Sequence, residues 1–386
     1  MACLCADGRA GGPREVIMRV AIDRDALLAV LDAVHGAANP RGAVPILGNV
    51  RLAASCRDGL TAACCDLDML LEASTTPDGP AINGVVTAEV GRLHALVRRL
   101  PKGTKVELAA ADGHLCLNAA GFSARLPSLP AEEFPTLAGP EGAEPLEAPG
   151  QELARAFGTV AHAASTEEVR YYLNGVCVRP ADDGLVLCAT DGHRLCELRL
   201  GLPGRPPLPD AGVIVPRAAF RPIHRLAAAA GDERVMLVSD GRTLAASNRR
   251  WDRLVTRLVD GTFPAYERLI PQDRTDVARV ARADLLEAVQ RAAVLAADGP
   301  VRLVFGAQAL DVGVDGAGGS AGERVPMSFD GEPRALAFNP RYLADMLGAL
   351  AGGHVELLPG QPAAPLLVRD PEGDPTLRYL LMPMRA

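Results

Sequence analysis

Apolar residues recur at helical spacing in six stretches of this chain, and the stretches fall into two sets of three. Apolar positions three and four residues apart give a helix one apolar face, so each stretch predicts an amphipathic helix. Because the two sets alternate along the chain, they predict three similar domains with two helices each. One set reads RDALLAVLDAVHGA near Leu28, QELARAFGTVAHAA near Leu153 and RADLLEAVQRAAVLA near Leu286. The other set covers residues 86–100, 215–228 and 338–350.

Short runs rich in Val, Leu and Cys lie between these helices and are separated by Asp-Gly turns. Such runs are typical of strands joined by tight turns, which favours antiparallel sheets. We therefore expect an α+β protein with two helices and antiparallel sheets in every domain. The expected strands are 50–54, 60–64, 69–73, 106–110 and 115–118, then 175–179, 185–189, 194–200, 235–239 and 254–258, then 301–305, 309–314, 354–358, 365–369 and 377–382.

Matching strings set the length of the repeat. The spacing from Asn49 to Asn174 is 125 residues, and so is that from Asp66 to Asp191. Solenoid and propeller repeats run about 20–50 residues, so this period indicates whole domains in series. We expect an N-terminal extension (1–17) that is disordered, with either Met1 or Met18 as the start. The expected domains are 18–139, 148–270 and 275–386.

Composition narrows the class of protein. The chain is 48% hydrophobic and 23% charged, as in globular proteins, and it lacks the run of about 18 apolar residues that spans a membrane. Its first 17 residues lack the apolar core of a signal peptide. None of the nine cysteines forms a C-x2-C pair, so we expect no zinc site and a reducing, cytoplasmic compartment.

The net charge of −7 argues only weakly against DNA binding, because the placement of positive charge matters more than its total. On one helix a cationic face is most often only solvated, but its recurrence in three domains favours contact with a phosphate backbone. Pro222 should interrupt and kink the second of these helices. The cations assigned to the second helices and their ends are Arg92, Arg98, Arg99, Lys102, Lys105, Arg217, Arg221, Arg225, Arg334 and Arg341.

The strings that suggest catalysis are weak. GGSAG near Gly318 matches the G-x-S-x-G nucleophile pattern, but that chemistry needs a strand-to-helix turn, and Gly-rich flanks indicate a flexible loop. A hydrolase using Ser320 and a histidine stays as an alternative that requires such a turn. The seven histidines show no metal-ligand spacing, and no Walker A string occurs. We therefore expect no catalytic residue, metal or cofactor.

Several strings, in the same order, resemble the family of bacterial DNA polymerase III beta subunits, the sliding clamps. The resemblance covers residues 18–386, and its specificity comes from the number of strings. They are VPILGNV (44–50), EEVRYYLNGV (167–176), ATDGHRL (189–195), VIVPR (213–217), LVDGTFPAYERLIP (258–271) and MPMR (382–385).

The resemblance implies a processivity factor of DNA replication that is not an enzyme. Members form a head-to-tail homodimer whose six domains close into a ring, so one chain would be half of a DNA clamp. Helices would face double-stranded DNA without reading its sequence. Implied partners are the polymerase III catalytic subunit, the clamp loader and repair proteins, through short apolar peptides, in the bacterial cytoplasm with the nucleoid. An auxiliary paralogous clamp, for repair or for tolerating an inhibitor, is the alternative.

The same resemblance implies three groups of site residues. The partner-peptide pocket would be formed by Leu173, Thr190, Gly192, His193, Arg194, Leu195, Pro264, Arg268, Leu269, Leu380, Met382, Pro383 and Met384, with Arg194 and Arg268 holding polar groups of the peptide. DNA would be contacted by Arg41, Arg170, Tyr171 and Tyr172, beside the helix residues Arg98, Arg99, Arg217, Arg221 and Arg225. Apolar dimer contacts are expected from Val294, Leu295, Phe122 and Leu126.

The ion pairs of the dimer interface are depleted in this chain. Where the family presents an acidic run in its third domain, residues 314–325 contain only the acids Asp315 and Glu323. The basic counterpart, residues 121–127, contains only Arg125. We therefore expect a dimer interface that is less sensitive to salt than is usual in the family.

Overall fold

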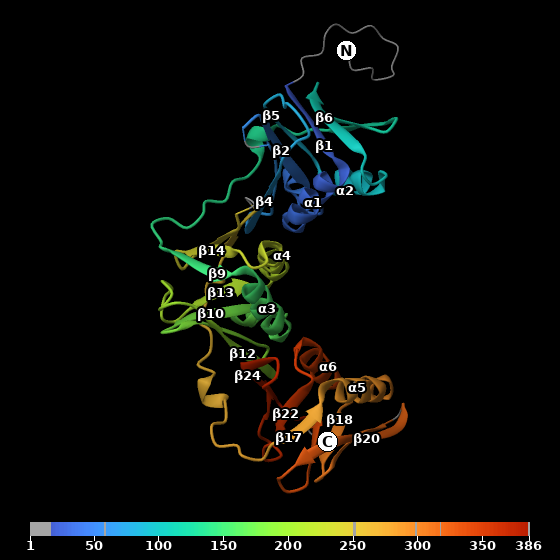
Figure 1. The fold of residues 1–386 in the computed structure, drawn as a ribbon, viewed down its shortest axis with the longest axis vertical. Coiled ribbons are helices and arrows are strands. Elements are labelled where there is room, and N and C mark those ends of the chain that lie inside the picture. The colour runs from blue at the N-terminus through green and yellow to red at the C-terminus, as the bar shows by residue number, and fades with distance from the viewer. Residues whose placement is uncertain (1–16, 58, 250–251, 298, 317, 385–386) are drawn as a thin grey trace. The chain divides into compact units, whose positions relative to one another are not determined.

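The computed structural model describes residues 17–57, 59–249, 252–297, 299–316 and 318–384 (Figure 1). Within these residues the same order of elements occurs three times: one strand, one α-helix, four strands, one α-helix and three strands. This confirms the prediction of three similar α+β domains with two α-helices each.

The three copies have the following bounds. The first contains β1 (Met18–Asp23), α1 (Arg24–Val34), β2 (Asn49–Ser55), β3 (Gly59–Cys65), β4 (Met69–Thr75), β5 (Gly84–Glu89), α2 (Val90–Arg99), β6 (Lys105–Ala111), β7 (His114–Ala119) and β8 (Phe122–Pro127). The second contains β9 (Pro145–Pro149), α3 (Gly150–Val160), β10 (Gly175–Ala181), β11 (Gly184–Thr190), β12 (Arg194–Gly201), β13 (Val213–Pro216), α4 (Phe220–Ala230), β14 (Arg234–Ser239), β15 (Thr243–Ser247) and β16 (Arg253–Arg257). The third contains β17 (Ala278–Ala281), α5 (Arg282–Ala296), β18 (Val301–Phe305), β19 (Ala309–Gly316), β20 (Gly319–Phe329), β21 (Arg334–Phe338), α6 (Pro340–Ala349), β22 (His354–Leu358), β23 (Leu366–Asp370) and β24 (Asp374–Leu381).

The second helix of each copy is shorter than the periodicity predicts, because a strand takes its first residues. Val86, predicted to be helical, lies on β5 opposite Leu52 of β2. Val, Thr and Ala in this run suit either a strand or a helix, so the pairing with a neighbouring strand decides. The patterns miss nine strands (β1, β5, β8, β9, β13, β15, β17, β20 and β21), and most of them lead straight into a helix.

Polar side chains fix the start of two helices. Asp23 accepts a hydrogen bond from the backbone N–H of Asp25 (2.7 Å) and so caps α1. Asn339 accepts one from the N–H of Arg341 (2.9 Å) and caps α6. The expected interruption at Pro222 does not occur, because α4 begins at Phe220 and the proline lies in the first turn. Backbone N–H groups in a first turn have no helical partner, so proline costs no hydrogen bond there.

An arginine at the start of α1 ties this helix to α2. Arg24 is buried and donates from Nε to the carbonyl of Val97 (3.0 Å) and from Nη2 to the carbonyl of Arg98 (2.5 Å). Carbonyls in the last turn of a helix have no helical N–H to pair with, so the arginine satisfies them. Arg24 is therefore a structural residue.

The third copy repeats this tie and the second copy lacks it. Arg282, at the start of α5, donates to the carbonyl of Leu347 in the last turn of α6 (3.0 Å) and to that of Gly352, which follows the helix (2.9 Å). The second copy has Gly150 at this place, where a Cβ atom would lie 2.5 Å from the carbonyl oxygen of Ala227. Close packing of backbone on backbone replaces the arginine in this copy.

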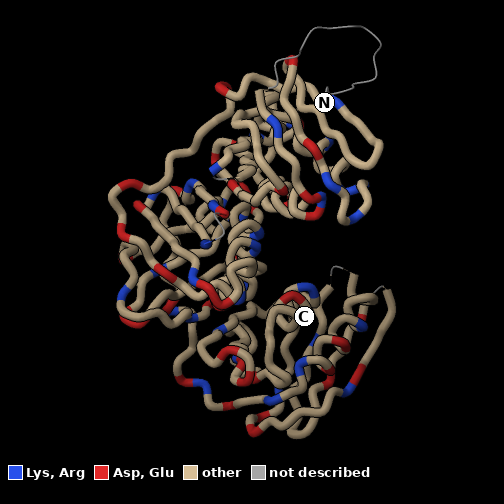
Figure 2. Tube along the Cα trace, turned by 45° about the horizontal axis from the view of Figure 1, so that its top comes forward, with Lys and Arg blue, Asp and Glu red and all other residues tan. Residues whose placement is uncertain are grey.

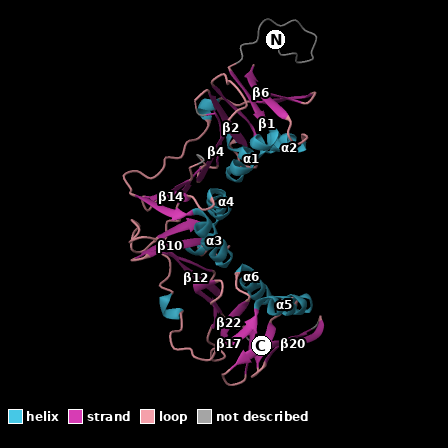
Figure 3. Ribbon diagram, in the orientation of Figure 1, coloured by secondary structure: helices cyan, strands magenta, loops and turns pink. Residues whose placement is uncertain are grey.

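The chain packs into two compact units. The first comprises the described residues within Met1–Gln151 and Arg221–Arg257. It holds a four-stranded sheet, β1-β6-β7-β8, and an eight-stranded sheet, β5-β2-β3-β4-β16-β15-β14-β9. Strand β4 of the first copy pairs with β16 of the second, and Glu72 forms an ion pair with Arg253 across them (3.2 Å). Helix α1 packs on α2 and on strands β3 and β4 (Figure 3).

The second unit consists of Glu152–Phe220 and Leu258–Ala386 and holds one twelve-stranded sheet. Its order is β13-β10-β11-β12-β24-β23-β22-β17-β20-β19-β18-β21, so β12 of the second copy pairs with β24 of the third. Helix α5 packs on α6 and on strands β19 and β20. None of the helices in the described residues has both the length and the apolar character to cross a membrane.

Candidate partner pocket and DNA-facing cations

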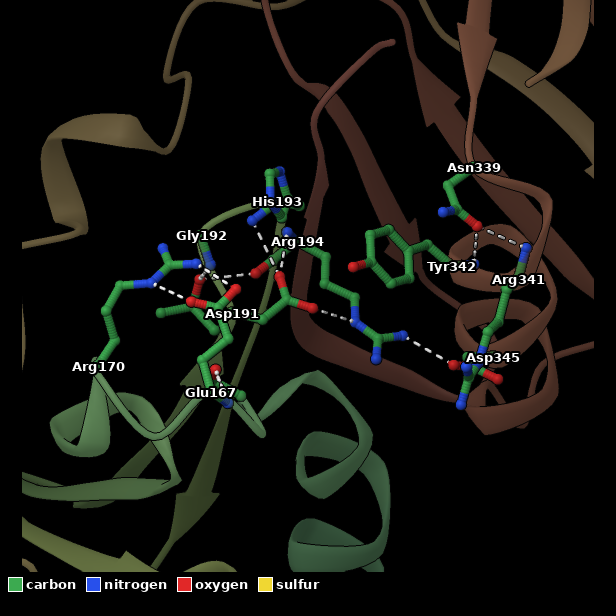
Figure 4. Close-up of polar contacts among 12 residues, drawn as sticks. Glu167, Arg170, Asp191, Gly192, His193, Arg194, Asn339, Arg341, Tyr342 and Asp345 are labelled. Carbon is green, nitrogen blue, oxygen red and sulfur yellow. Dashed lines mark hydrogen bonds and ion pairs between the residues drawn. The ribbon is translucent and has the colours of Figure 1, made fainter. Parts of the chain in front are cut away.

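The turn between β11 and β12 carries four candidate pocket residues and is held by its own side chains (Figure 4). Oδ1 of Asp191 accepts hydrogen bonds from the N–H groups of His193 (2.9 Å) and Arg194 (3.0 Å). The hydroxyl of Thr190 accepts one from the N–H of Gly192 (3.1 Å) and donates to the carbonyl of Arg194 (2.6 Å). Gly192 has a φ of 89°, which residues with a Cβ rarely adopt. The string ATDGHRL therefore encodes a well-fixed turn.

The side chain of Arg194 is largely shielded from solvent and is paired within the protein. Its side chain is 9% exposed and donates to Oδ2 of Asp191 (3.0 Å) and Oδ2 of Asp345 (2.9 Å) (Figure 4). Its guanidinium lies 4.4 Å from the ring centroid of Tyr342. Two carboxylates and an aromatic face satisfy a buried guanidinium. Of the two arginines expected to hold peptide groups, only Arg268 is exposed.

The C-terminal strand lies directly beside this turn. Leu380 of β24 pairs with Leu195 of β12, and the N–H of Met382 donates to the carbonyl of His193 (2.8 Å). Leu195 and Leu380 are 3% and 4% exposed and belong to the core, whereas Met382 is 41% exposed. The structure thus brings the turn and the C-terminal segment together, with Met382 accessible to a ligand.

The strap, which we define as residues 263–270, carries three further candidates. Pro264, Arg268 and Leu269 are exposed, and Leu269 has 62% of its surface in contact with solvent. Tyr266 faces the other way and packs in the same core cluster as two of the pocket leucines. The strap is therefore anchored inside and presents apolar surface outside.

A cavity of about 670 Å³ lies beside the C-terminal segment, and the candidates Pro383 and Met384 line it. The N–H of Met384 donates to the carbonyl of Ala337 at the edge of β21 (2.7 Å). Sequence reasoning misses the other lining residues, because alanines and prolines in edge strands and loops form no distinctive pattern. The other residues that line this cavity are Arg302, Ala335, Leu336, Ala337, Pro362 and Ala363.

Arg170 belongs to the predicted DNA-facing loop, and its side chain extends toward the pocket turn (Figure 4). Its Nε and Nη2 donate to the two carboxylate oxygens of Glu167 (2.9 and 2.8 Å), and this guanidinium lowers the pKa of Glu167. Its Nη1 lies 2.6 Å from the place where a Cβ on Gly192 would stand. The charge of Arg170 is therefore already paired within the protein.

The two tyrosines and the leucine after Arg170 form a short 3-10 turn, Tyr171–Leu173. Tyr171 is 53% exposed, and its ring meets that of Tyr172 edge-on at 5.8 Å between centroids. Leu173, a candidate pocket residue, is 3% exposed. Tyr171 is thus the aromatic ring of this loop that a base can reach.

The other candidate DNA-contacting arginines are exposed. Figure 2 shows Lys and Arg along the chain together with Asp and Glu. Exposed arginines keep a charge that a phosphate can approach. They are Arg41 in the loop before β2, Arg98 and Arg99 at the end of α2, Arg217 in a 3-10 turn, and Arg221 and Arg225 one turn apart on α4.

The third copy contributes less positive charge than the sequence suggests. Arg334 lies on β21 and not on a helix, and it donates to Oδ2 of Asp276 (2.6 Å) and to the carbonyl of Pro359 (3.2 Å). Arg341 on α6 is exposed. The assignment of Arg334 to a helical cationic face is therefore wrong.

A largely buried histidine packs against β24 in the second unit. The ring of His162 stacks on that of Tyr379, with 5.6 Å between centroids and 3° between planes. Burial, reinforced by the nearby charge of Arg194, lowers the pKa of His162 to about 4. His162 is therefore neutral at physiological pH.

The four candidate dimer residues differ in exposure. Val294, near the end of α5, is 81% exposed, and Phe122 on the edge strand β8 is 41% exposed. Leu295 is half-buried. Leu126 is 7% exposed and packs in the core, because it lies opposite Leu115 of β7. Val294 and Phe122 therefore offer the accessible apolar surface.

One of the two acids of the expected interface, Glu323, is already paired within the chain. The carboxylate of Glu323 accepts hydrogen bonds from Nη2 (2.6 Å) and Nε (2.9 Å) of Arg291. Strand β20 pairs with β17 only through residues 327–329, so residues 319–325 pair on one side alone, with β19. The described part of β20 thus has a partly open edge.

Ser320 does not lie on a nucleophile elbow. It belongs to β20, opposite Asp315 of β19, and the strand continues to Phe329. The hydrolase alternative and the expectation of a loop at this serine are both wrong, because the Gly-rich string forms a strand of a hairpin. The described residues also hold no group of three or more His, Cys, Asp or Glu side chains arranged to bind a metal.

Comparison with known proteins agrees with this architecture. Models of the DNA polymerase III beta subunit match in order: the N-terminal domain over residues 18–138, the central domain over 147–265 and the C-terminal domain over 267–385. The beta sliding clamp of Caulobacter vibrioides (strain NA1000 / CB15N) is 35% identical to this chain, in an alignment that covers 95% of this chain and 100% of that relative. The beta sliding clamp of Synechococcus elongatus is 32% identical, covering 95% and 99%.

Solved structures show the same similarity. A crystal structure of the Caulobacter crescentus beta sliding clamp with bound PEG aligns with a TM-score of 0.85 at 35% identity, covering 96% of this chain and 99% of that one. The sliding clamp of Pseudomonas aeruginosa bound to griselimycin aligns with a TM-score of 0.87 at 29% identity, covering 96% and 100%. Fold and motifs together define a three-domain clamp protein. The chain belongs to the DNA polymerase III beta subunit family, the beta sliding clamps.

Proposed function

We propose that this chain is a sliding clamp, a processivity factor that encircles duplex DNA and tethers the replicative polymerase and other partners. The observation that carries this proposal is the match of all three domains, with 35% identity over 95% of the chain and a TM-score of 0.85. A ring holds DNA by topology and catalyses no reaction, so we propose no enzymatic activity. Its place of action would be the bacterial cytoplasm, on nucleoid DNA.

Exposed arginines support a contact with DNA that does not depend on sequence. Arg98 and Arg99 end α2, and Arg221 and Arg225 project from α4. Guanidinium groups that neutralise phosphates release counterions, and this favours binding without base contacts. Weak contacts are sufficient in a closed ring, because the protein must also slide.

Salt dependence tests this interaction. The affinity of the double variant Arg221→Gln/Arg225→Gln for a short duplex should depend less steeply on salt. The slope of the logarithm of affinity against the logarithm of salt concentration should become shallower by about 0.9 for each phosphate that is no longer neutralised. Arg302→Gln, an exposed arginine on β18, is the matched control. Equal slopes in the double variant and the control would contradict the proposal that α4 contacts DNA.

Two strand edges support a head-to-tail homodimer. Strand β8 ends the four-stranded sheet of the first unit, and among the described strands residues 319–325 of β20 pair only with β19. Open strand edges pair readily with another chain. Phe122 and Val294 add exposed apolar surface to the two elements. We therefore propose that β8 of one protomer meets the β20 region of its partner.

Exposed apolar side chains support a peptide-binding pocket in the second unit. Leu269 of the strap, Met382 and Met384 are 62%, 41% and 37% exposed, although each is a large apolar residue. Methionine is flexible and polarizable, so it adapts to different ligands. The proposed ligand is a short peptide with apolar anchors, and Arg268 is the cation placed to meet its polar groups.

Peptide binding tests the pocket. Met382→Ala should weaken the binding of a fluorescein-labelled pentapeptide with two leucines and one phenylalanine by about tenfold, since removing a central apolar contact costs at least 1–2 kcal/mol. Met236→Ala, which removes a methionine that is 44% exposed on β14, is the matched control. Fluorescence anisotropy measures both. Unchanged affinity in Met382→Ala would sink the pocket assignment.

An auxiliary clamp is the second candidate function. The internal pairing of Glu323 with Arg291 favours it, because a carboxylate so held is less available to a partner protomer. A clamp specialised for repair or inhibitor tolerance requires a second clamp in the same cell. Depletion of this protein decides between the roles: arrested replication indicates the principal clamp, and continued replication indicates the auxiliary one.

A further inference from the structure

Side chains, and not strand pairing, hold the strap to the sheet. Its own backbone order is a single 3-10 turn, Glu267–Leu269, closed by hydrogen bonds to the carbonyls of Tyr266 and Glu267. No strand of the described sheets includes these residues. The exposed Leu269 therefore depends on side-chain anchors for its position.

Arg179, near the C-terminal end of β10, supplies such an anchor. Its Nη2 donates to the hydroxyl of Tyr266 (2.7 Å), its Nη1 pairs with the carboxylate of Glu267, and its guanidinium lies 5.0 Å from the Tyr266 ring centroid. The side chain of Arg179 is 26% exposed, so these bonds are shielded in part from water. A planar fork with several donors can hold two acceptors at once, which a lysine cannot do with the same geometry.

Groups other than Arg179 also hold the hydroxyl of Tyr266 in place. Burial, with the neighbouring thiol of Cys188 and the carboxylate of Glu197, raises the pKa of Tyr266, so the hydroxyl keeps its proton. Tyr266 is 1% exposed, and its ring meets that of Phe263 edge-on at 6.0 Å between centroids. A buried hydroxyl with partners on both sides leaves the strap little freedom.

We infer that Arg179 is a positioning residue for the peptide pocket: through Tyr266 and Glu267 it holds the strap, and with it Leu269, against the sheet. The inference rests on the proposed pocket and deepens it. Arg179 need not touch the peptide. Its role is to present Leu269 in one place, so that less ordering is required when a ligand binds.

A charge exchange tests the inference. Arg179→Glu places a second carboxylate beside Glu267 and should weaken pentapeptide binding by about tenfold. The double variant Arg179→Glu/Glu267→Arg restores opposite charges at the two positions. Its affinity should return to within about threefold of the wild type, a coupling of the size seen between contacting residues. Arg199→Glu, the same charge change at an exposed residue of β12, is the control.

Amide hydrogen exchange separates local positioning from general loss of stability. In Arg179→Glu the amides of residues 266–270 should exchange faster while those of β11 keep their rates. Wild-type affinity in folded Arg179→Glu, or no recovery in the double variant, would overturn the inference. If the wild type itself fails to bind the peptide, or Met382→Ala binds as the wild type does, the pocket is at fault and not the role of Arg179.

Discussion

Gly192 is the residue of the pocket turn at which a side chain would strain the backbone. Its φ is 89°, and a Cβ atom would stand 2.6 Å from Nη1 of Arg170. Gly192→Ala should cost about 1–2 kcal/mol of stability through backbone strain and should displace Arg170 from Glu167. We expect a lower melting temperature and weaker binding of the pentapeptide.

The control for this variant is Gly201→Ala, at the far end of β12. A Cβ there meets no heavy atom within 4 Å, so stability and binding should be nearly those of the wild type. Equal behaviour of the two variants would contradict the steric argument at Gly192.

His162 makes the stability of the second unit depend on pH on the acidic side. Its folded pKa of about 4 lies below the usual 6.5, so the unfolded chain takes up a proton first as the pH falls. The stabilising contribution is complete above about pH 6.5 and is lost toward pH 4, at up to about 1.4 kcal/mol per pH unit. Urea unfolding should show this loss.

His162→Phe keeps an aromatic ring on Tyr379 and removes the titrating group. Its stability should change less than that of the wild type between pH 6.5 and 4. The same slope in both proteins would show that other groups cause the acid sensitivity.

At the scale of elements, Arg282 should matter more than an exposed arginine of the same copy. Arg282→Met keeps much of the apolar stem but loses the hydrogen bonds to the carbonyls of Leu347 and Gly352. This loss should lower the free energy of unfolding by about 1–3 kcal/mol. Arg279→Met on β17 removes an exposed pair with Glu372 and should cost less than about 1 kcal/mol. Urea unfolding compares the two, and an equal cost would contradict the proposed tie between the helices.

Helices and strands differ in how well the sequence predicts them. The periodic stretch near Leu286 predicts α5, because apolar spacing reports a buried face directly. The sequence does not predict strand β5, because its partner β2 lies 30–40 residues earlier (Ala54 opposite Gly84, Asn49 opposite Glu89). A local pattern of apolar and polar residues does not show that pairing. Arg24 and Arg282 look like surface cations in the sequence, but their carbonyl partners come from a different helix.

The candidate pocket shows the same limit. ATDGHRL predicts the turn, since Asp191 and Gly192 encode it locally. The burial of Arg194 and the anchoring of the strap by Arg179 could not be predicted, because Asp345 and Tyr266 are distant in the sequence. Family resemblance names the pocket residues, but long-range contacts decide which of them face a ligand.

At the scale of the whole molecule, the expected dimer should tolerate salt. Phe122 and Val294 are exposed and apolar, and Glu323 is paired within its own chain. Apolar contact and strand pairing respond less to ionic strength than surface ion pairs do. Sedimentation velocity from low to high salt should therefore show a similar dimer fraction. Marked dissociation only at high salt would contradict this prediction.

Strand pairing between copies has a consequence for how the protein can be divided. In the second unit β24 of the third copy pairs with β12 of the second, so Tyr379 is fully buried and lies opposite Cys196. Expressed alone, residues 275–386 would leave β24 as a bare edge beside apolar surface, a template for aggregation. We expect that fragment to aggregate at concentrations at which the full chain stays dispersed, as light scattering would show. The sequence repeats divide the chain into three copies, whereas the sheets that two copies share must be kept whole in any fragment.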